Sequence, residues 1–140
     1  MTDYWLYTRM TVRQERLNEV MDMKAVEVIE ANYRAVEGSF LEQLHEYNHF
    51  DLRAFEALCE AIAVLSMIDK ENQQIASEMV FIWTQTLLHI IYHFDPQDLS
   101  RINDLPENYN EHIARLEQLV MQYLGQAEKA RKEGAGVYNG

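Results

Sequence analysis

The chain has few residues that interrupt helices, with two prolines and five glycines among its 140 residues. Three of the glycines lie within residues 134–140. Proline costs a helix interior about 3 kcal/mol and glycine about 1 kcal/mol, so a body with so few of them favours helices over a turn-rich β fold. At this length we expect one domain with its own core.

Cysteine is nearly absent, because Cys59 is the only one, and an internal disulfide is therefore excluded. A chain without disulfides suits a reducing compartment. Residues 1–10 lack the basic start and long apolar stretch of a signal peptide. We therefore expect a cytoplasmic protein. Cys59 stands among small and apolar neighbours, which predicts a core residue rather than a catalytic thiol.

Positive charge is also scarce, with 12 Lys and Arg against 23 Asp and Glu and a formal net charge of −11. Binding to phosphates needs a concentrated basic surface, so the sequence argues against nucleic acid and against anionic membranes as partners. An acidic surface favours a basic protein partner, or else serves only solubility.

No charged residue occurs between Met79 and Phe94. Apolar residues follow two neighbouring helical seams through this run, one of Ala76, Val80, Trp83, Leu87, Ile90 and Phe94, the other of Ile75, Met79, Ile82, Thr86, His89 and His93. A helix that is apolar nearly all round has to be surrounded. The run is short for a membrane span and carries polar residues, which predicts a core helix or a subunit interface.

Capping signals divide the rest of the chain into segments. We expect helices over residues of about 12–36, 40–48, 52–68, 71–94 and 107–132, with one or two helical turns over 96–103. The predicted N-caps are Thr11 (with Gln14 as its capping-box partner), Ser39, Asp51 and Asp69, while Asp95 before Pro96 starts a new turn. Residues 1–10 show no helical phase and are expected to form an extended N-terminal arm, and residues 134–140 a flexible tail.

The predicted fold is therefore all-α. Residues 1–133 form a single domain, a helical bundle of four main helices plus one or two short helices around the central apolar helix at about 71–94. The last helix carries a strict heptad-like seam, made of Tyr109, Ile113, Leu116, Val120, Tyr123, Ala127 and Ala130. This seam, the seams of the central helix and several aromatic residues also predict a homodimer.

Four of the five histidines form two pairs spaced by four residues, His45 with His49 and His89 with His93. On a helix this spacing places two imidazoles on one face, as metal binding requires. The first pair matches the HExxH pattern of helical zinc hydrolases, in which a glutamate acts as general base. However, the sequence around Asn48 predicts the end of the helix, which would turn His49 out of line with His45. The sequence after the motif also offers no identifiable third metal ligand.

If the two pairs converge inside the bundle, they could bind zinc or iron with His112, Glu46 or Glu111 completing the site. The chain lacks the Glu-x-x-His pairs of di-iron bundles. The alternative is that these histidines are packing residues of the core or an interface. Motifs of nucleophilic catalysis and of nucleotide binding are absent from the sequence, which favours a protein without catalytic activity and without a cofactor.

Between residues 37 and 69 seven acids stand against the single base Arg53. The acids we predict to bind a basic partner are Glu42, Glu46, Asp51, Glu56 and Glu60; the alternative is a solvated face. The leading hypothesis is a small acidic cytoplasmic protein-binding or regulatory factor, of the immunity, antitoxin, adaptor or secretion-chaperone type. The competing hypothesis is a metal-binding helical bundle that uses the paired histidines, as a zinc-dependent hydrolase or without activity.

Overall fold

The computed structural model describes the backbone of residues 2–68 and 72–134, and the side chains of residues 12–68 and 72–125. The described residues form five helices and no strand. The helices are α1 (Thr2–Tyr33), α2 (Phe40–Tyr47), α3 (Leu52–Leu65), α4 (Gln73–Phe94) and α5 (Tyr109–Gly134). The predicted all-α bundle of four main helices with a short one is confirmed.

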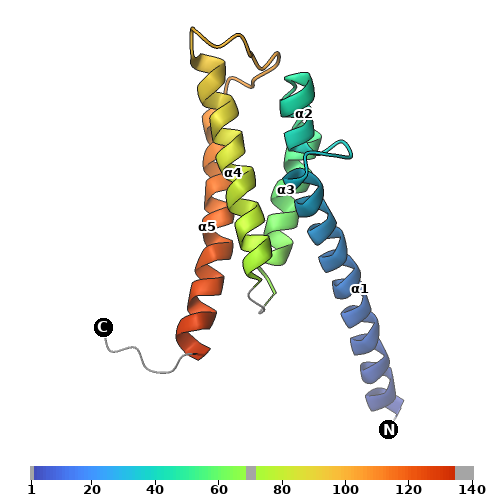
Figure 1. The fold of residues 1–140 in the computed structure, drawn as a ribbon. Coiled ribbons are helices and arrows are strands. Elements are labelled where there is room, and N and C mark those ends of the chain that lie inside the picture. Colours follow the sequence, from blue (N-terminus) through green and yellow to red (C-terminus); the bar gives the residue numbers. More distant parts are fainter. Residues whose placement is uncertain (1, 69–71, 135–140) are drawn as a thin grey trace.

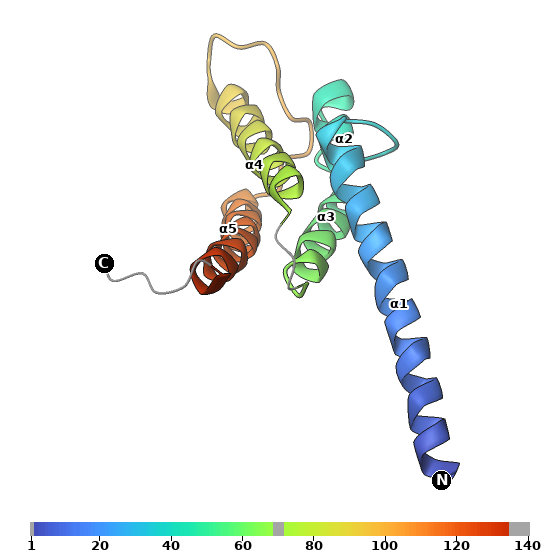
Figure 2. The same cartoon turned by 60° about the horizontal axis from the view of Figure 1, so that its bottom comes forward.

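The four long helices pack as the corners of a square (Figure 1). Helix α1 packs on α3 and α4, and α5 packs on the same two helices from the opposite corner. The short helix α2 packs against α4, α1 and α3 at the upper end in Figure 1. The N-terminal half of α1 leaves this arrangement and extends beyond the other helices, as Figure 2 shows from a second direction.

Two of the predicted N-caps are confirmed. The side chain of Ser39 accepts a hydrogen bond from the backbone N–H of Glu42, and that of Asp51 accepts one from Ala54. Each cap satisfies an N–H group that the first helical turn leaves unpaired. The link before Ser39 contains left-handed backbone at Ala35, Glu37 and Gly38, which turns the chain sharply after α1.

Several predicted boundaries differ from the structure. Helix α1 begins at Thr2, so the extended arm predicted over residues 1–10 and the N-cap predicted at Thr11 are both wrong. No proline or glycine precedes Gly38, so nothing stops the helix from propagating through these residues. Helix α4 begins after Asn72, whose side chain accepts from Ile75 N–H; Asp69, the predicted cap, lies outside the described residues. Helix α5 continues to Gly134, and the rest of the predicted tail, 135–140, also lies outside them.

The helical turns predicted over 96–103 are wrong, because this segment is an irregular loop. Asp95 is the C-cap of α4 rather than the N-cap of a new turn. The side chains of Asp95 and Asp98 accept hydrogen bonds from the backbone of Gln97 and Ser100, each two residues on. Such local bonds compete with helix formation. The guanidinium of Arg101 donates to the carbonyl oxygen of Ser100 in this segment and to those of Tyr92 and Asp95 at the end of α4.

The core lies between α3 and the inner faces of the other helices. Side chains that are fully buried come from all five helices and include Ile29, Phe40, Leu44, Phe55, Leu58, Ile62, Met79, Ile82, Leu116 and Val120. Two T-shaped ring contacts join Phe40 to Phe50 and to Phe55 where α2 meets α3. Aromatic pairs of this kind add about 0.5–1.5 kcal/mol to the burial of their surface.

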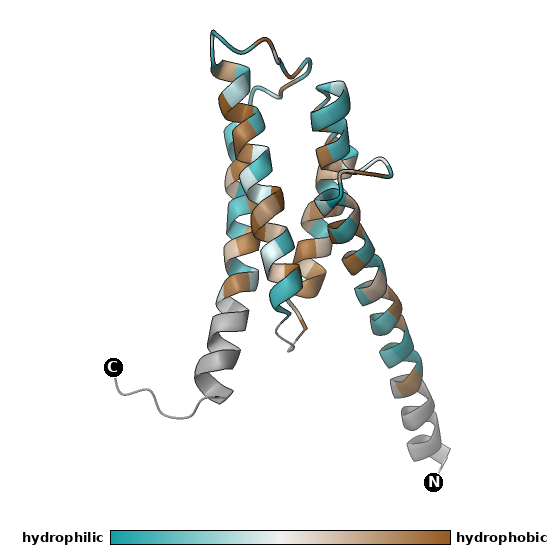
Figure 3. Ribbon diagram, in the orientation of Figure 1, coloured by the Kyte–Doolittle hydropathy of each residue, from teal (hydrophilic) through white to brown (hydrophobic). Residues whose placement is uncertain are grey.

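Helix α4 is surrounded on one side only. Its buried residues are Ile75, Glu78, Met79, Ile82 and Thr86, so the second of the two predicted seams is the one that faces the core. On the opposite side, Val80, Phe81 and Ile91 are exposed. Figure 3 colours several turns of the α4 ribbon brown for apolar residues. Among the described residues, α4 is also the one helix long and apolar enough to cross a membrane, a property that core helices of soluble proteins share.

A buried asparagine joins α1 to α2. The Asn32 side chain donates to the carbonyl oxygen of Val28 at 3.0 Å and accepts from Leu41 N–H at 3.1 Å. Asn32 is 2% exposed, so water does not replace either bond. The second bond satisfies an N–H group in the first turn of α2 and fixes the angle between the two helices.

We predict that Asn32→Ala lowers the free energy of unfolding by about 1–3 kcal/mol, because it leaves the buried Leu41 N–H without a partner. Urea denaturation followed by circular dichroism measures the change. Asn18→Ala is the matched control on the same helix: its amide bonds only to Gln14 on the surface, and we expect a change within about 0.5 kcal/mol. Equal effects of the two substitutions would contradict the structural role of Asn32.

Candidate functional site

The structure brings together one histidine of each pair. The rings of His45 on α2 and His89 on α4 have centroids 5.5 Å apart in a T-shaped contact. They line a small cavity of about 130 Å³ together with Tyr33, Ala35, Leu41, Phe81 and Gln85. Burial, reinforced by the charge of His45, lowers the pKa of His89, so this imidazole is held in its neutral form.

The other two histidines are engaged elsewhere. Helix α2 ends at Tyr47 and Asn48 is left-handed, with φ 52°, which turns His49 out of line with His45 as the sequence suggested. The Nδ1 atom of His49 forms a hydrogen bond with the carboxylate of Asp104. The Nδ1 atom of His93 accepts a hydrogen bond from the backbone N–H of Ile102 at 2.9 Å. Both contacts therefore tie the loop after α4 to the bundle.

These contacts separate the four predicted metal ligands. The rings of His45 and His89 contact each other, whereas His49 is hydrogen-bonded to Asp104 and His93 to Ile102. His112, the suggested fifth ligand, packs against Phe50 and Phe55. In the part of the chain that the structure describes, no group of three or more His, Cys, Asp or Glu residues could hold a metal ion.

The carboxylate of Asp104 is the centre of the contact between this loop and the corner between α2 and α3. One oxygen accepts from Phe50 N–H at 2.7 Å, and the other bonds to His49. Partial burial raises the pKa of Asp104, but the hydrogen bonds from Phe50 and His49 outweigh it, so the pKa lies below its usual value. Asn103 adds two bonds to the same corner, from its N–H to Asn48 O and from its amide to Tyr47 O.

The five acids predicted to bind a partner lie on two helices and one cap. Glu42 and Glu46 belong to α2, and Glu46 is exposed. Asp51 is occupied as the N-cap of α3. On α3, Glu60 is exposed, while Glu56 forms an ion pair with Arg115 of α5 that lowers the pKa of its carboxyl group. Two of the five predicted residues therefore have partners within the chain.

Cys59 is the one nucleophile that the sequence offered, and it lies in the core at 1% exposure. Burial raises the pKa of its thiol to about 11. A thiolate is the reactive form of cysteine, so this group is inert at neutral pH.

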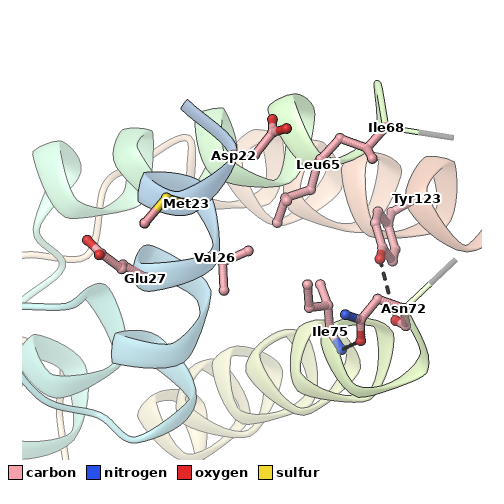
Figure 4. Close-up of a pocket in the computed structure, with 9 residues that line it drawn as sticks. All are labelled: Asp22, Met23, Val26, Glu27, Leu65, Ile68, Asn72, Ile75 and Tyr123. Atoms are coloured by element: carbon pink, nitrogen blue, oxygen red, sulfur yellow. Dashed lines mark hydrogen bonds between the residues drawn. The ribbon is translucent and has the colours of Figure 1, made fainter. Parts of the chain in front are cut away.

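A second opening lies at the end of the bundle, between the end of α3 and the start of α4. It is a cavity of about 520 Å³ with a wall from each of the four long helices (Figure 4). Its lining is formed by Asp22, Met23, Val26 and Glu27 of α1, Leu65 and Ile68 at the end of α3, Asn72 and Ile75 at the start of α4, and Tyr123 of α5. It is about four times as large as the cavity beside His45 and His89.

The interior of this end cavity is mainly apolar. Figure 4 shows the side chains of Val26, Leu65 and Ile75 pointing into it from three different helices. The hydroxyl of Tyr123 donates to the carbonyl oxygen of Asn72 at 3.4 Å, so these two polar groups of the lining bond to each other. The α1 wall adds two carboxylates, of the half-buried Asp22 and the exposed Glu27.

Sequence patterns did not reveal this cavity. Tyr123 belongs to the predicted apolar seam of the last helix, where it does lie, but a seam indicates only which face of a helix is buried. The opening arises because the lower half of α1 diverges from α4 and α5, as Figure 1 shows. That divergence depends on helix crossing angles, which have no signal in a single sequence.

Comparisons with protein families, curated proteins and solved structures found no match to this chain. Its function has to be argued from the geometry of the end cavity and from the chemistry of its walls.

We predict that His89 titrates below the ordinary histidine pKa of about 6.5, because burial disfavours the imidazolium form. His45→Gln should raise the pKa of His89 part of the way, because it removes a neighbouring positive charge and leaves the burial in place. Glu46→Gln, one position along α2, is the control and should not move it. Two-dimensional NMR of the imidazole resonances against pH measures all three values.

The lowered pKa of His89 makes the free energy of unfolding depend on pH. The unfolded chain binds a proton at His89 more readily than the folded chain, so this group destabilises the fold as the pH falls through about 6.5. A His89 pKa at or above the ordinary value would contradict the packing of the two rings.

Proposed function

We propose that this protein is a non-catalytic binding factor that docks a segment of a partner protein in the end cavity. The docked segment carries an apolar side chain that enters the cavity and a basic residue beside it. The observation that carries the proposal is the end cavity itself, an apolar opening with walls from four helices and carboxylates on one side.

The size and lining of the end cavity suit an apolar side chain. A volume of about 520 Å³ exceeds any single side chain, so a docked segment would place one or two anchors inside. The exposed Met23 stands at the opening, and flexible methionines are common on surfaces that accept varied helices. An amphipathic helix that inserts apolar anchors into a groove is the binding mode that these features fit.

Charge determines the second property of the partner. Asp22 and Glu27 give the α1 wall two negative charges, and the chain as a whole carries a net charge of −11. An acidic protein attracts basic segments over long range and so speeds their association. The proposed partner surface is therefore apolar and basic, in agreement with the basic partner expected from the sequence.

Immunity proteins, antitoxins, adaptors and secretion chaperones all act by holding a segment of another protein, and we propose a role of this class. The competing metal site would rest on His45 and His89 alone, with no third ligand beside them among the described residues. We therefore do not propose a zinc or iron function.

We predict that filling the end cavity abolishes partner binding without loss of the fold. Val26→Trp places an indole in the opening, and Leu99→Trp adds the same group to a loop residue that is 97% exposed. The probe is an array of amphipathic helical peptides with leucine anchors and either lysine or glutamate flanks. We expect lysine-flanked peptides to bind the wild type and the Leu99→Trp variant with equal affinity. Their affinity for the Val26→Trp variant should be at least about tenfold lower.

Binding of glutamate-flanked peptides as strongly as lysine-flanked ones would overturn the charge part of the proposal. Equal binding by Val26→Trp and Leu99→Trp would overturn the end cavity as the site. Circular dichroism of both variants establishes that the helices are retained.

We predict that the double substitution Asp22→Asn with Glu27→Gln lowers the affinity for lysine-flanked peptides several-fold at low salt. The difference in affinity from the wild type should disappear at about 0.5 M salt, where exposed charges are screened. Glu46→Gln with Glu60→Gln is the matched control, because these exposed carboxylates lie away from the end cavity. Fluorescence anisotropy at increasing salt measures both. A larger loss of affinity in the control pair would contradict the end cavity as the site and would indicate binding at the acidic residues of α2 and α3.

A further inference from the structure

We infer that the small cavity beside His45 and His89 binds a primary ammonium group, as found at the end of a lysine side chain. This histidine cavity has a volume of about 130 Å³ and is lined from the end of α1, from α2 and from α4. None of its lining residues also lines the end cavity. The inference therefore goes beyond the proposed function and does not depend on it.

Four aromatic rings line the histidine cavity. Tyr33 and Phe81 form an edge-to-face pair with ring centroids 5.1 Å apart and an interplanar angle of 71°. His45 and His89 form a second pair, at 5.5 Å and 82°. Because the two rings of each pair are nearly perpendicular, the aromatic walls differ in orientation. Walls of this kind form the aromatic cages that bind organic cations through the negative faces of the rings.

The polar side chains of this lining have no partner within the described part of the chain. There, the Tyr33 hydroxyl, the Gln85 amide and the two imidazoles form no hydrogen bond. The free polar atoms of Gln85 and His89 are also accessible, since Trp83 Nε1 is the one sealed and unpaired side-chain atom among the described residues. Each of these four side chains can accept a hydrogen bond, and a primary ammonium group offers three N–H donors.

Charge favours a cation over an anion. The lining itself contains no Asp, Glu, Lys or Arg. Within two positions of a lining residue along the chain, the single base Arg34 stands against three acids, Glu37, Glu42 and Glu46. Helix α4 adds no charge, because none occurs from Met79 to Phe94. The surroundings are therefore net negative, which attracts an ammonium group and repels a carboxylate or a phosphate.

The size and exposure of the histidine cavity suit the end of an alkylammonium chain. Tyr33 is 44% exposed and Phe81 41%, so a ligand reaches the cavity from solvent. A water molecule takes up about 30 Å³ of the liquid, so a cavity of about 130 Å³ holds about four or five non-hydrogen atoms. An ammonium group with three methylene groups has this size, and it places its charge between the rings.

The test is an NMR titration of the full chain that follows the ring resonances of His45, His89 and Phe81. At about pH 8 imidazoles are neutral, since the ordinary histidine pKa is about 6.5. We expect n-propylammonium to produce saturable shifts, with an affinity at least about tenfold above those of n-propanol and propionate, because hydrogen bonds from a charged donor are the stronger ones. Tetramethylammonium, which has no N–H group, should bind several-fold more weakly than n-propylammonium.

A lysine probe identifies the source of the ammonium group. Nα-acetyl-lysine amide should shift the same ring resonances if a lysine side chain of a protein is the occupant. Shifts by n-propylammonium alone would assign the same site to a small free amine.

Two substitutions test the roles of the lining. Gln85→Leu removes an acceptor at similar volume, and it should lower the affinity for n-propylammonium by about tenfold while leaving that for tetramethylammonium unchanged. A general loss of packing would lower both. Phe81→Leu removes one ring and should lower both affinities about two- to fivefold. The matched controls on α4 are Thr84→Val and Phe94→Leu, at exposed residues outside the lining, and they should change neither affinity.

Three results would overturn the inference. They are an affinity for n-propanol or propionate equal to that for n-propylammonium, ring resonances of His45 and His89 that do not shift, and a Gln85→Leu variant that binds both cations as the wild type does or loses both alike. Circular dichroism of each variant establishes that the helices are retained. The resonances of Val26 report the end cavity separately, so failure of one cavity can be told apart from failure of the other.

Discussion

The burial of one seam of α4 is the constraint on which the rest of this structure depends. Helix α4 has no charged residue from Met79 to Phe94, so its orientation is set by which apolar side packs inward. Met79 and Ile82 are buried in this helix, which packs on both α1 and α5, and Thr86 can be fully buried because its hydroxyl donates to the Ile82 carbonyl at 2.8 Å. With α4 fixed in this way, α1 and α5 are separated by it, and the end cavity opens between them.

The fold could largely be read from the sequence, because caps and helical periodicity are local signals. Ser39 and Asp51 stand where their side chains satisfy the first turn of a helix, and the structure uses both. The side of α4 that is buried could not be chosen from apolar character, since the seam that faces the core carries Thr86 and two histidines whereas the other seam is wholly apolar. The loop over 96–103 was not predicted, because an aspartate can either cap a helix or accept a hydrogen bond within a local turn. Asp95 and Asp98 do the second, since each side chain accepts from the backbone N–H two residues on.

The candidate site was less accessible to sequence reasoning. The spacing of the histidine pairs was visible, but one left-handed residue, Asn48, decides that His49 turns toward Asp104 rather than toward His45. The end cavity has no motif at all, because its nine lining residues come from four helices and few are neighbours in the chain. The sequence contributes the charge of the partner that we propose, through the net charge of −11.

The central claim of this account is that the end cavity accepts an apolar group attached to a positive charge. The most direct measurement uses small probes, n-butylammonium and n-butyrate, added to protein with labelled methyl groups. We expect butylammonium to shift the methyl resonances of Val26, Leu65 and Ile75, and butyrate to shift them much less. Shifts that are equal for the two probes, or that leave these three residues unchanged, would contradict the account.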